Sequence, residues 1–187
     1  MSARPPPPEY NSPSLSFLYG TFHVTHSSLP MWKSKRNVRI TYKPLAPSIA
    51  SIPSDSTDRL DDLVEYQGLS GEKIHAVNGV DKASSQARDK WDWRGKGWLM
   101  IATSHWEILG WGEESRSDGE KNKWAVTYFA KTLFTPAGLD IYSGHETGLE
   151  EKTLHGIKQA LAKIDDESVR KLAHDIFEIK HDSILHK

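Results

Sequence analysis

The stretch Asn37-Val-Arg-Ile-Thr-Tyr-Lys-Pro-Leu45 alternates apolar or aromatic side chains with polar ones. Val38, Ile40 and Tyr42 take one face of an extended chain, and Arg39 with two further polar residues takes the other, because successive side chains of a β-strand point to opposite faces. The proline near its end cannot donate a hydrogen bond to a sheet and ends the strand. This stretch therefore predicts a strand with one buried and one exposed face.

Segments of similar texture recur at short spacing along most of the chain. The expected strands are residues 17–26, 37–45, 62–67, 72–78, 98–111, 124–134 and 139–143. Turn residues such as Gly71 and Pro136 separate them. Short strands at this spacing indicate a β-sandwich or β-barrel rather than alternating strands and helices. Since closure removes exposed edge strands, we predict a mainly β protein built on an antiparallel closed β-barrel.

The two ends of the chain differ from this barrel segment, residues 15–145. Residues 1–14 are polar and rich in proline, which predicts a disordered tail. Residues 146–187 carry apolar side chains at helical spacing and predict C-terminal α-helices packed on the barrel. Thr147-Gly-Leu-Glu150 fits a capping box for the first helix, and the acidic run Asp165–Glu167 suits the start of a second. The same helices could instead make a subunit contact, which leaves a homodimer open.

Composition limits the classes of partner. The formal net charge of -1 gives no global field that would gather nucleic acid or an anionic membrane. The lack of cysteine removes disulfides, thiolate catalysis and cysteine metal sites. No apolar run is long enough to span a bilayer, and the N-terminus does not resemble a signal peptide. We therefore expect a cytoplasmic protein with no nucleic-acid and no membrane partner.

Motifs for metals and cofactors are missing from the sequence. There is no His-x-His or His-Glu-x-x-His spacing, and His23 and His26 fall on opposite faces of a regular strand. Neither a nucleophile elbow nor a glycine-rich phosphate loop is present. We expect no metal and no cofactor.

The first strand carries Gly20-Thr21-Phe22. With the antiparallel strands and C-terminal helix that follow, this motif resembles the lipocalin-like (calycin) barrels, which often begin with Gly-x-Trp at that place. The resemblance covers the order of elements over about residues 15–180, with Phe22 in place of the tryptophan. It implies an eight-stranded barrel that holds one small ligand. Such barrels include carriers of apolar molecules as well as cofactor-free enzymes, among them phenolic acid decarboxylases and pericyclic cyclases.

All but one of the seven tryptophans lie between Trp91 and Trp124. Indoles are large and carry one N–H that needs a partner when buried. Two interpretations remain open at this point: core filling in a sheet, or a stacking wall for a planar ligand.

Residues 98–111 and 124–134 form an expected hairpin. If Trp111 opposes Trp124, Glu107 faces Tyr128, and His105 lies on the same face. That face also carries Leu109 and Val126. Under an apolar wall, desolvation would raise the pKa of the glutamate, and the phenol could donate to a developing anion. If the face points outward instead, the set is a solvated cross-strand group.

Four further residues follow from the first two strands. If Phe22 points inward, so does His26, which would then be a catalytic candidate near one barrel mouth. Tyr42 lines the interior if Arg39 faces out; the reverse arrangement would make Arg39 an anion clamp. A loop at residues 46–58 stands between the second and third strands, and its role as a lid is left open.

The pattern predicts a cofactor-free lyase, isomerase or cyclase. It would act by acid–base catalysis on a small aromatic, terpenoid or polyketide-like molecule, with the catalytic groups Glu107, Tyr128, His105 and His26. The substrate-binding candidates are Trp111, Trp124, Phe22, Tyr42, Val126, Leu109 and Arg39. The alternative is a non-catalytic carrier or sensor of an apolar small molecule; a purely structural role through the helices is a third hypothesis.

Overall fold

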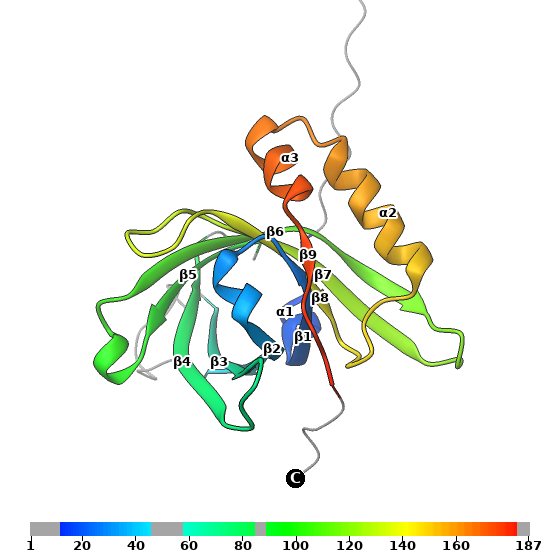
Figure 1. The fold of residues 1–187 in the computed structure, drawn as a ribbon. Coiled ribbons are helices and arrows are strands. Elements are labelled where there is room, and N and C mark those ends of the chain that lie inside the picture. The colour runs from blue at the N-terminus through cyan, green and yellow to red at the C-terminus, as the bar shows by residue number, and fades with distance from the viewer. Residues whose placement is uncertain (1–11, 46–57, 85–88, 183–187) are drawn as a thin grey trace, which may run out of the picture.

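The computed structural model describes residues 12–45, 58–84 and 89–182 (Figure 1). Its strands are β1 (Gly20–Ser27), β2 (Lys35–Pro44), β3 (Arg59–Gly68), β4 (Ile74–Ala83), β5 (Lys90–Gly95), β6 (Thr103–Ser115), β7 (Lys121–Phe129), β8 (Gly138–Ser143) and β9 (Phe177–Glu178). Its helices are α1 (Leu15–Leu18), α2 (Glu151–Ala162) and α3 (Glu167–His174), with 3-10 turns η1 (Pro30–Ser34) and η2 (Gly97–Leu99).

Strands β1 to β8 close into an antiparallel barrel. Each strand pairs with the next along the chain, and β8 returns to pair with β1. Closure satisfies the backbone groups that an open sheet would leave at its edges. The predicted mainly β barrel with C-terminal helices is confirmed.

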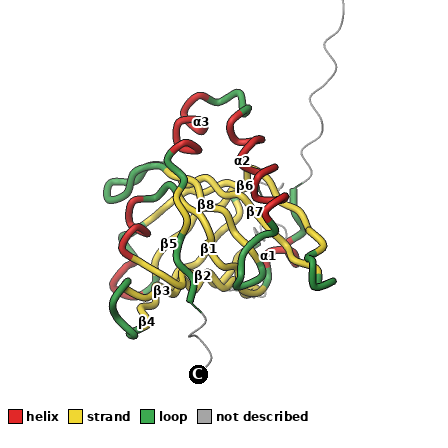
Figure 2. Tube along the Cα trace, turned by 45° about the vertical axis from the view of Figure 1, so that its right-hand side comes forward, coloured by secondary structure: helices red, strands yellow, loops and turns green. Residues whose placement is uncertain are grey.

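Two hydrophobic cores lie on opposite sides of the barrel wall. The inner core fills the barrel and includes Phe22, Tyr42, Trp91 and Trp106. The outer core lies between the wall and the two C-terminal helices, which Figures 1 and 2 show together on one side of the barrel. Its buried residues are Val126, Leu139, Ile141, Ile157, Leu161 and Val169. Strands β7 and β8 are therefore covered on both faces.

The last described residues, 177–182, enter the gap where β1 and β2 diverge. β9 pairs with the end of β1, and Lys180 forms a parallel bridge with Arg36 of β2. Ile179 is only 3% exposed and belongs to the inner core. Asp182 accepts hydrogen bonds from the side chains of Arg36 and Asn37. The C-terminal segment is thus part of the barrel wall.

Several local expectations need correction. β5 lies between the expected strands 72–78 and 98–111 and was missed. The capping box is wrong: α2 begins at Glu151 after Glu150, whose side chain makes no capping bond. Of the predicted tail, residues 1–11 lie outside the described residues, but Pro13 is buried and Ser14 caps α1. The predicted loop lies outside them too, apart from its last residue.

Candidate functional site

The barrel interior is built from stacked aromatic rings. Trp106 of β6 stacks on Trp91 of β5, with ring centroids 5.8 Å apart, and on Tyr42 of β2, at 5.9 Å. Phe129 of β7 extends the stack at 6.3 Å. Offset stacking at these distances adds to the burial energy of each ring. The rings make a rigid apolar wall around the few polar groups inside.

Two carboxyl groups, Asp62 of β3 and Asp81 of β4, lie in this interior and are 5% and 0% exposed. The indole Nε1 of Trp106 donates to Asp81 Oδ1 at 2.8 Å. Asp62 Oδ1 and Asp81 Oδ2 are buried and have no hydrogen-bond partner among the described residues. Burial raises the pKa of both carboxyls, and the neighbouring charge of Asp81 raises that of Asp62 further. The pair is therefore suited to sharing a proton at neutral pH.

A third buried carboxyl stands on the next part of the inner wall. Asp140 of β8 is 1% exposed, and burial raises its pKa to about 7. The hydroxyls of Thr127 and Tyr142 are also buried without a hydrogen-bond partner in the described ranges. Burial raises the pKa of Tyr142 well above its ordinary value. The interior thus holds hydroxyls and carboxyls of raised pKa within an aromatic shell.

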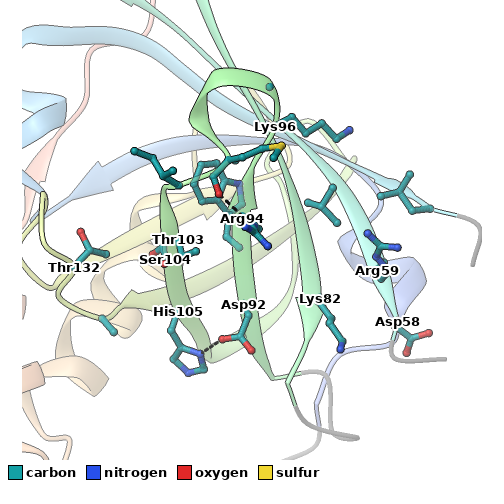
Figure 3. A pocket seen from close by; sticks show the side chains of 18 of the residues that line it. Asp58, Arg59, Lys82, Asp92, Arg94, Lys96, Thr103, Ser104, His105 and Thr132 are labelled. Carbon is teal, nitrogen blue, oxygen red and sulfur yellow. Dashed lines mark hydrogen bonds and ion pairs between the residues drawn. The ribbon is translucent and has the colours of Figure 1, made fainter. Parts of the chain in front are cut away.

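An open depression of about 1530 Å³ reaches the barrel interior at Trp93. Its lining runs along β5 and β6 and over the β5–β6 and β7–β8 connections (Figure 3). Trp93 pairs with Asp81 across β4 and β5, packs against the inner core, and donates a hydrogen bond that lowers the pKa of Asp62. A Cβ on Gly79 would lie 2.0 Å from Trp93 Nε1, so glycine is required for the indole to lie there. Trp93 separates the depression from the acid pair.

The outer side of the depression carries a second titratable group. His105 Nδ1 lies 2.9 Å from Asp92 Oδ1, and its Nε2 lies 3.2 Å from Glu107 Oε1. Figure 3 shows the His105 ring directed at Asp92. Burial lowers the pKa of His105, but the hydrogen bonds to Asp92 and Glu107 outweigh it and raise the pKa overall. Both His105 and Asp92 line the depression.

The structure brings Glu107, Tyr128 and His105 together as predicted, but on the outer face. Glu107 pairs with Tyr128 in the expected register. Its neighbours in β6, Trp106 and Ile108, are buried in the inner core, so Glu107 points out. The inward orientation is therefore wrong. The catalytic role of these residues stays a prediction.

A β-bulge at Leu109 breaks the expected register. Gly110 pairs with Val126 and Trp111 pairs with Ala125, so the predicted pairing of Trp111 with Trp124 is wrong. The extra residue turns Trp111 inward, where it packs on Phe17 at 4.9 Å. The remaining members of the predicted wall, Leu109, Trp124 and Val126, contact the outer core beneath the helices.

A second bulge changes the place of His26. β1 shifts register between Val24 and His26, so Phe22 faces the interior as predicted while His26 faces outward; the inward placement of His26 is wrong. The bulge also puts His23 and His26 on the same face. Arg39 faces outward, where its Nε bonds Glu65 at 2.8 Å. Tyr42 lies inside, as the alternative with Arg39 outside predicted.

A smaller groove of about 720 Å³ lies outside β1, beside the C-terminal segment. His23, His26 and His181 line it, and the rings of His23 and His181 meet edge to face at 5.8 Å. Burial lowers the pKa of both His23 and His26 to about 4, with help from His181 for His23 and Lys158 for His26. The imidazoles of His23 and His26 are therefore neutral at pH 7.

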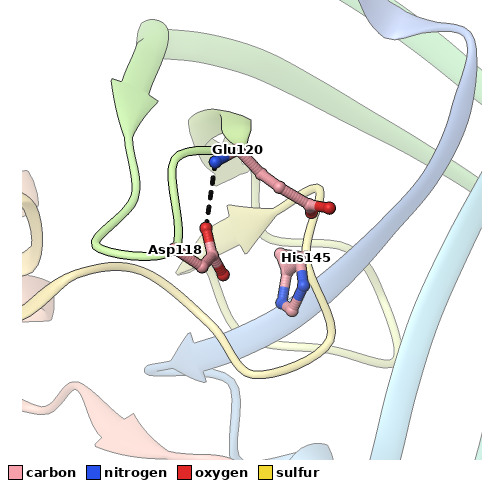
Figure 4. A group of neighbouring side chains, drawn as sticks. All are labelled: Asp118, Glu120 and His145. Atoms are coloured by element: carbon pink, nitrogen blue, oxygen red, sulfur yellow. Dashed lines mark hydrogen bonds between the residues drawn. The ribbon is translucent and has the colours of Figure 1, made fainter.

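Asp118, Glu120 and His145 form a group that could offer metal ligands in the described ranges (Figure 4). Asp118 already accepts bonds from Arg116 Nε and the Glu120 backbone N–H. The backbone N–H of Thr147 donates to His145 Nδ1 at 3.2 Å, which places the proton of a neutral ring on Nε2. Hydrogen bonding within two turns accounts for this grouping, and we assign no metal to it.

Sequence reasoning missed Asp62, Asp81, Asp140 and Trp93. A signal was present: Asp62 shares a strand face with Leu60, and Asp140 interrupts the apolar run Leu139–Tyr142. Acids at such positions indicate buried carboxyls, because the period of two leaves them no route to solvent.

Among curated proteins, the chain is similar to botcinic acid biosynthesis cluster B protein 12 of Botryotinia fuckeliana (strain B05.10). The two are 25% identical over 166 residues, which cover 86% of this chain and 71% of the relative. A scan against protein-family models finds none that matches.

Solved structures are similar at the level of fold. Lobster apocrustacyanin A1 matches with a TM-score of 0.59 and 12% identity, covering 91% of this chain and 81% of that one. The siderocalin Ex-FABP matches at 0.56 with 10% identity, over 90% and 97%. A biogenic amine-binding protein matches at 0.56 with 9% identity, over 90% and 82%. The chain therefore has the lipocalin-like (calycin) barrel fold that its strand order and its Gly20-Thr21-Phe22 motif predicted.

Proposed function

We propose that this protein binds a small, largely apolar organic molecule in the open depression, against the indole of Trp93, as part of natural-product metabolism. The observation that carries the proposal is the position of Trp93, which lines the depression on one side and contacts the inner core on the other. Ligand sites combine an apolar wall with a few placed polar groups. Here the polar part of the lining includes Ser104, His105 and Asp92 beside Trp93, and further charged side chains, most of them basic, stand around it: Asp58, Arg59, Lys82, Arg94, Lys96 and Lys131.

The comparisons support this ligand class without fixing it. The curated relative is named for a biosynthesis cluster, and two of the similar structures are described by the ligands they take, as a siderocalin with dual ligand specificities and as a biogenic amine-binding protein. At 9–12% identity, these structures support only the barrel fold and not the identity of a ligand. The size and polarity of the ligand follow from the depression itself.

A second candidate function is cofactor-free acid–base catalysis of the lyase, isomerase or cyclase type. Two observations favour it. The Asp62–Asp81 pair stands behind Trp93 with its pKa values raised, as a general acid requires near neutral pH. His105, held by Asp92, lies on the other border of the depression. A ligand in the depression would contact His105 directly and would reach the acid pair only if the indole of Trp93 moved aside.

Binding is tested by titration with 1-anilinonaphthalene-8-sulfonate, an aromatic probe whose fluorescence rises in apolar sites. We expect the parent protein to bind the dye with quenching of tryptophan emission. Gly79→Ala should weaken binding about tenfold, because its new Cβ must displace Trp93. The matched control is Gly71→Ala, whose Cβ meets nothing within 4 Å. Equal binding by the parent and both variants would remove Trp93 from the site.

Catalysis is tested with the compound that copurifies with the protein. Long incubation followed by mass spectrometry should reveal a product with the parent protein, and Asp81→Asn should lower its rate by at least tenfold while the compound still binds. His105→Gln reports on the outer group in the same assay. If the parent binds the compound and never converts it, the carrier function stands and the enzymatic one fails.

A further inference from the structure

Every large hydrophobic residue that is exposed in the described ranges belongs to one end of the barrel. In an antiparallel meander, the β1–β2, β3–β4, β5–β6 and β7–β8 connections share an end, because successive strands reverse direction. The exposed residues lie on these connections or at the strand ends beside them: Met31, Leu69, Ile74, Met100, Ile101, Leu133 and Phe134. Leu133 is 95% exposed, Ile101 85% and Phe134 76%.

Positive charge gathers at the same end. Residues 28–35, 68–74, 95–103 and 129–138 contain five lysines, Lys33, Lys35, Lys73, Lys96 and Lys131, and one acid, Glu72. Of these lysines, Lys96 forms an ion pair with Asp61 of β3. The whole chain carries a net charge of -1. We call this end the basic apolar rim.

The opposite end differs in both respects. Its β6–β7 hairpin, which Figure 1 shows projecting on the right, holds Arg116 and Lys121 against Asp118 and Glu120. None of the exposed large hydrophobic residues lies on that hairpin. Most of the β2–β3 and β4–β5 connections at that end lie outside the described residues, so the contrast is between the basic apolar rim and the β6–β7 hairpin.

We propose that the basic apolar rim docks on the surface of an anionic phospholipid bilayer. Apolar loop tips that enter the interface gain hydrophobic burial, and each lysine near an anionic surface adds an electrostatic attraction. A second copy of the chain fits this rim poorly, since a symmetric dimer would place five lysines against the same five. An anionic lipid surface suits both the lysines of the rim and the apolar residues at the tips of its connections.

The proposal concerns surface docking, not insertion. No described helix has the length and apolar character needed to cross a membrane. The expectation of no membrane partner rested on the net charge of the whole chain, which says nothing of how that charge is distributed. Met100, Ile101, Leu133 and Phe134 of the rim also line the depression, so docking would bring one part of the depression close to the bilayer. The docking itself does not depend on the ligand or on catalysis.

Co-sedimentation of the full chain with vesicles tests this inference. We expect binding to phosphatidylcholine vesicles that contain about one-third phosphatidylserine, and at least tenfold weaker binding to phosphatidylcholine alone. The triple variant Ile101→Ser, Leu133→Ser and Phe134→Ser should lose at least tenfold in affinity for the anionic vesicles. Lys121→Gln, on the opposite hairpin, is the control and should bind as the parent does. Circular dichroism verifies the fold of each variant.

Charge is tested separately. Lys73→Gln with Lys131→Gln should lower affinity for the anionic vesicles about fivefold for each lysine removed, and raised salt should weaken the parent in the same direction. Equal binding to neutral and anionic vesicles, or no loss in the triple variant, overturns the proposal. It is also overturned if size-exclusion chromatography shows a dimer that the triple variant dissolves while no vesicle binding occurs.

Discussion

Asp81 and Asp92 stand on neighbouring strands of one wall and differ in almost every physical respect. Asp81 points inward, is fully buried and accepts a bond from the Trp106 indole. Asp92 points outward, is exposed and contacts His105. The side-chain period of a strand is enough to place one carboxyl among aromatic rings and the other at the edge of solvent. The inner face holds carboxyls whose pKa burial raises, whereas the outer face holds an ion-pair network.

This contrast shows why a patterned strand is a poor guide to which face is inside. On β7 both faces are apolar, because the barrel core covers one and α2 and α3 cover the other. Glu107, Tyr128 and His105 were placed on one face correctly, yet that face looks away from the barrel. Of the acids that lie inside, Asp140 interrupts an apolar run in β8, whereas Asp62 and Asp81 belong to strands with several other polar residues.

The largest expected effect is loss of the inner aromatic stack. Trp91→Ala should lower the free energy of unfolding by about 3–5 kcal/mol, because it opens a cavity in a fully buried site and removes the stacking on Trp106. Urea denaturation measures this change. Asp92→Ala, the next residue on the outer face, should stay within about 0.5 kcal/mol. Similar losses in the two variants would contradict the division between faces.

The buried acid pair predicts that stability falls as pH rises. The pKa of Asp81 is raised to about 7, above about 3.9 for an unfolded aspartate, so the folded state binds the extra proton between these values. Stability should then decline from about pH 4 through pH 7, by at most ~1.4 kcal/mol per pH unit for one group. Asp81→Asn should flatten this slope in denaturation measured at several pH values.

Asp92→Asn is the matched amide change on the outer face. It leaves the buried pair intact, so the part of the slope that belongs to the pair should remain. A slope that persists in Asp81→Asn and disappears in Asp92→Asn would reverse the assignment of the two faces.

The histidines of the outer groove predict a smaller change of stability with pH, in the opposite direction to that of the acid pair. The pKa of His23 is lowered from 6.5 to about 4, so the folded state binds fewer protons than the unfolded chain between these values. Stability should fall as pH drops through that window, and His23→Gln should reduce the loss. His155→Gln on α2 is the control at an exposed histidine. If His23→Gln leaves the loss of stability at acidic pH unchanged, His23 is not its source.

Period-two alternation in strands such as residues 37–45, with the spacing of turns, was enough to predict the barrel, its C-terminal helices and the inward Phe22 and Tyr42. Two bulges, at Thr25 and Leu109, could not be predicted, since each depends on contacts with distant strands. One extra residue reversed the face of Trp111 and of His26.

The Asp62–Asp81 pair shows what the sequence could not predict. Asp62 and Asp81 meet only when β3 pairs with β4, with Asp62 opposite Gly79 and Asp81 opposite Leu60. Neither carboxyl was singled out from the sequence, although Asp62 shares a strand face with Leu60. Their proximity, and the indole of Trp93 over Gly79, follow from strand register and not from either strand alone.

Native mass spectrometry of the protein purified from its own cells, alongside the Gly79→Ala and Gly71→Ala variants expressed there, shows whether a ligand lies against Trp93. We expect a retained small organic molecule on the parent and on Gly71→Ala, and its loss from Gly79→Ala, where Trp93 can no longer lie over Gly79. Retention of the same molecule by all three proteins, or its absence from all three, would contradict a ligand site at Trp93.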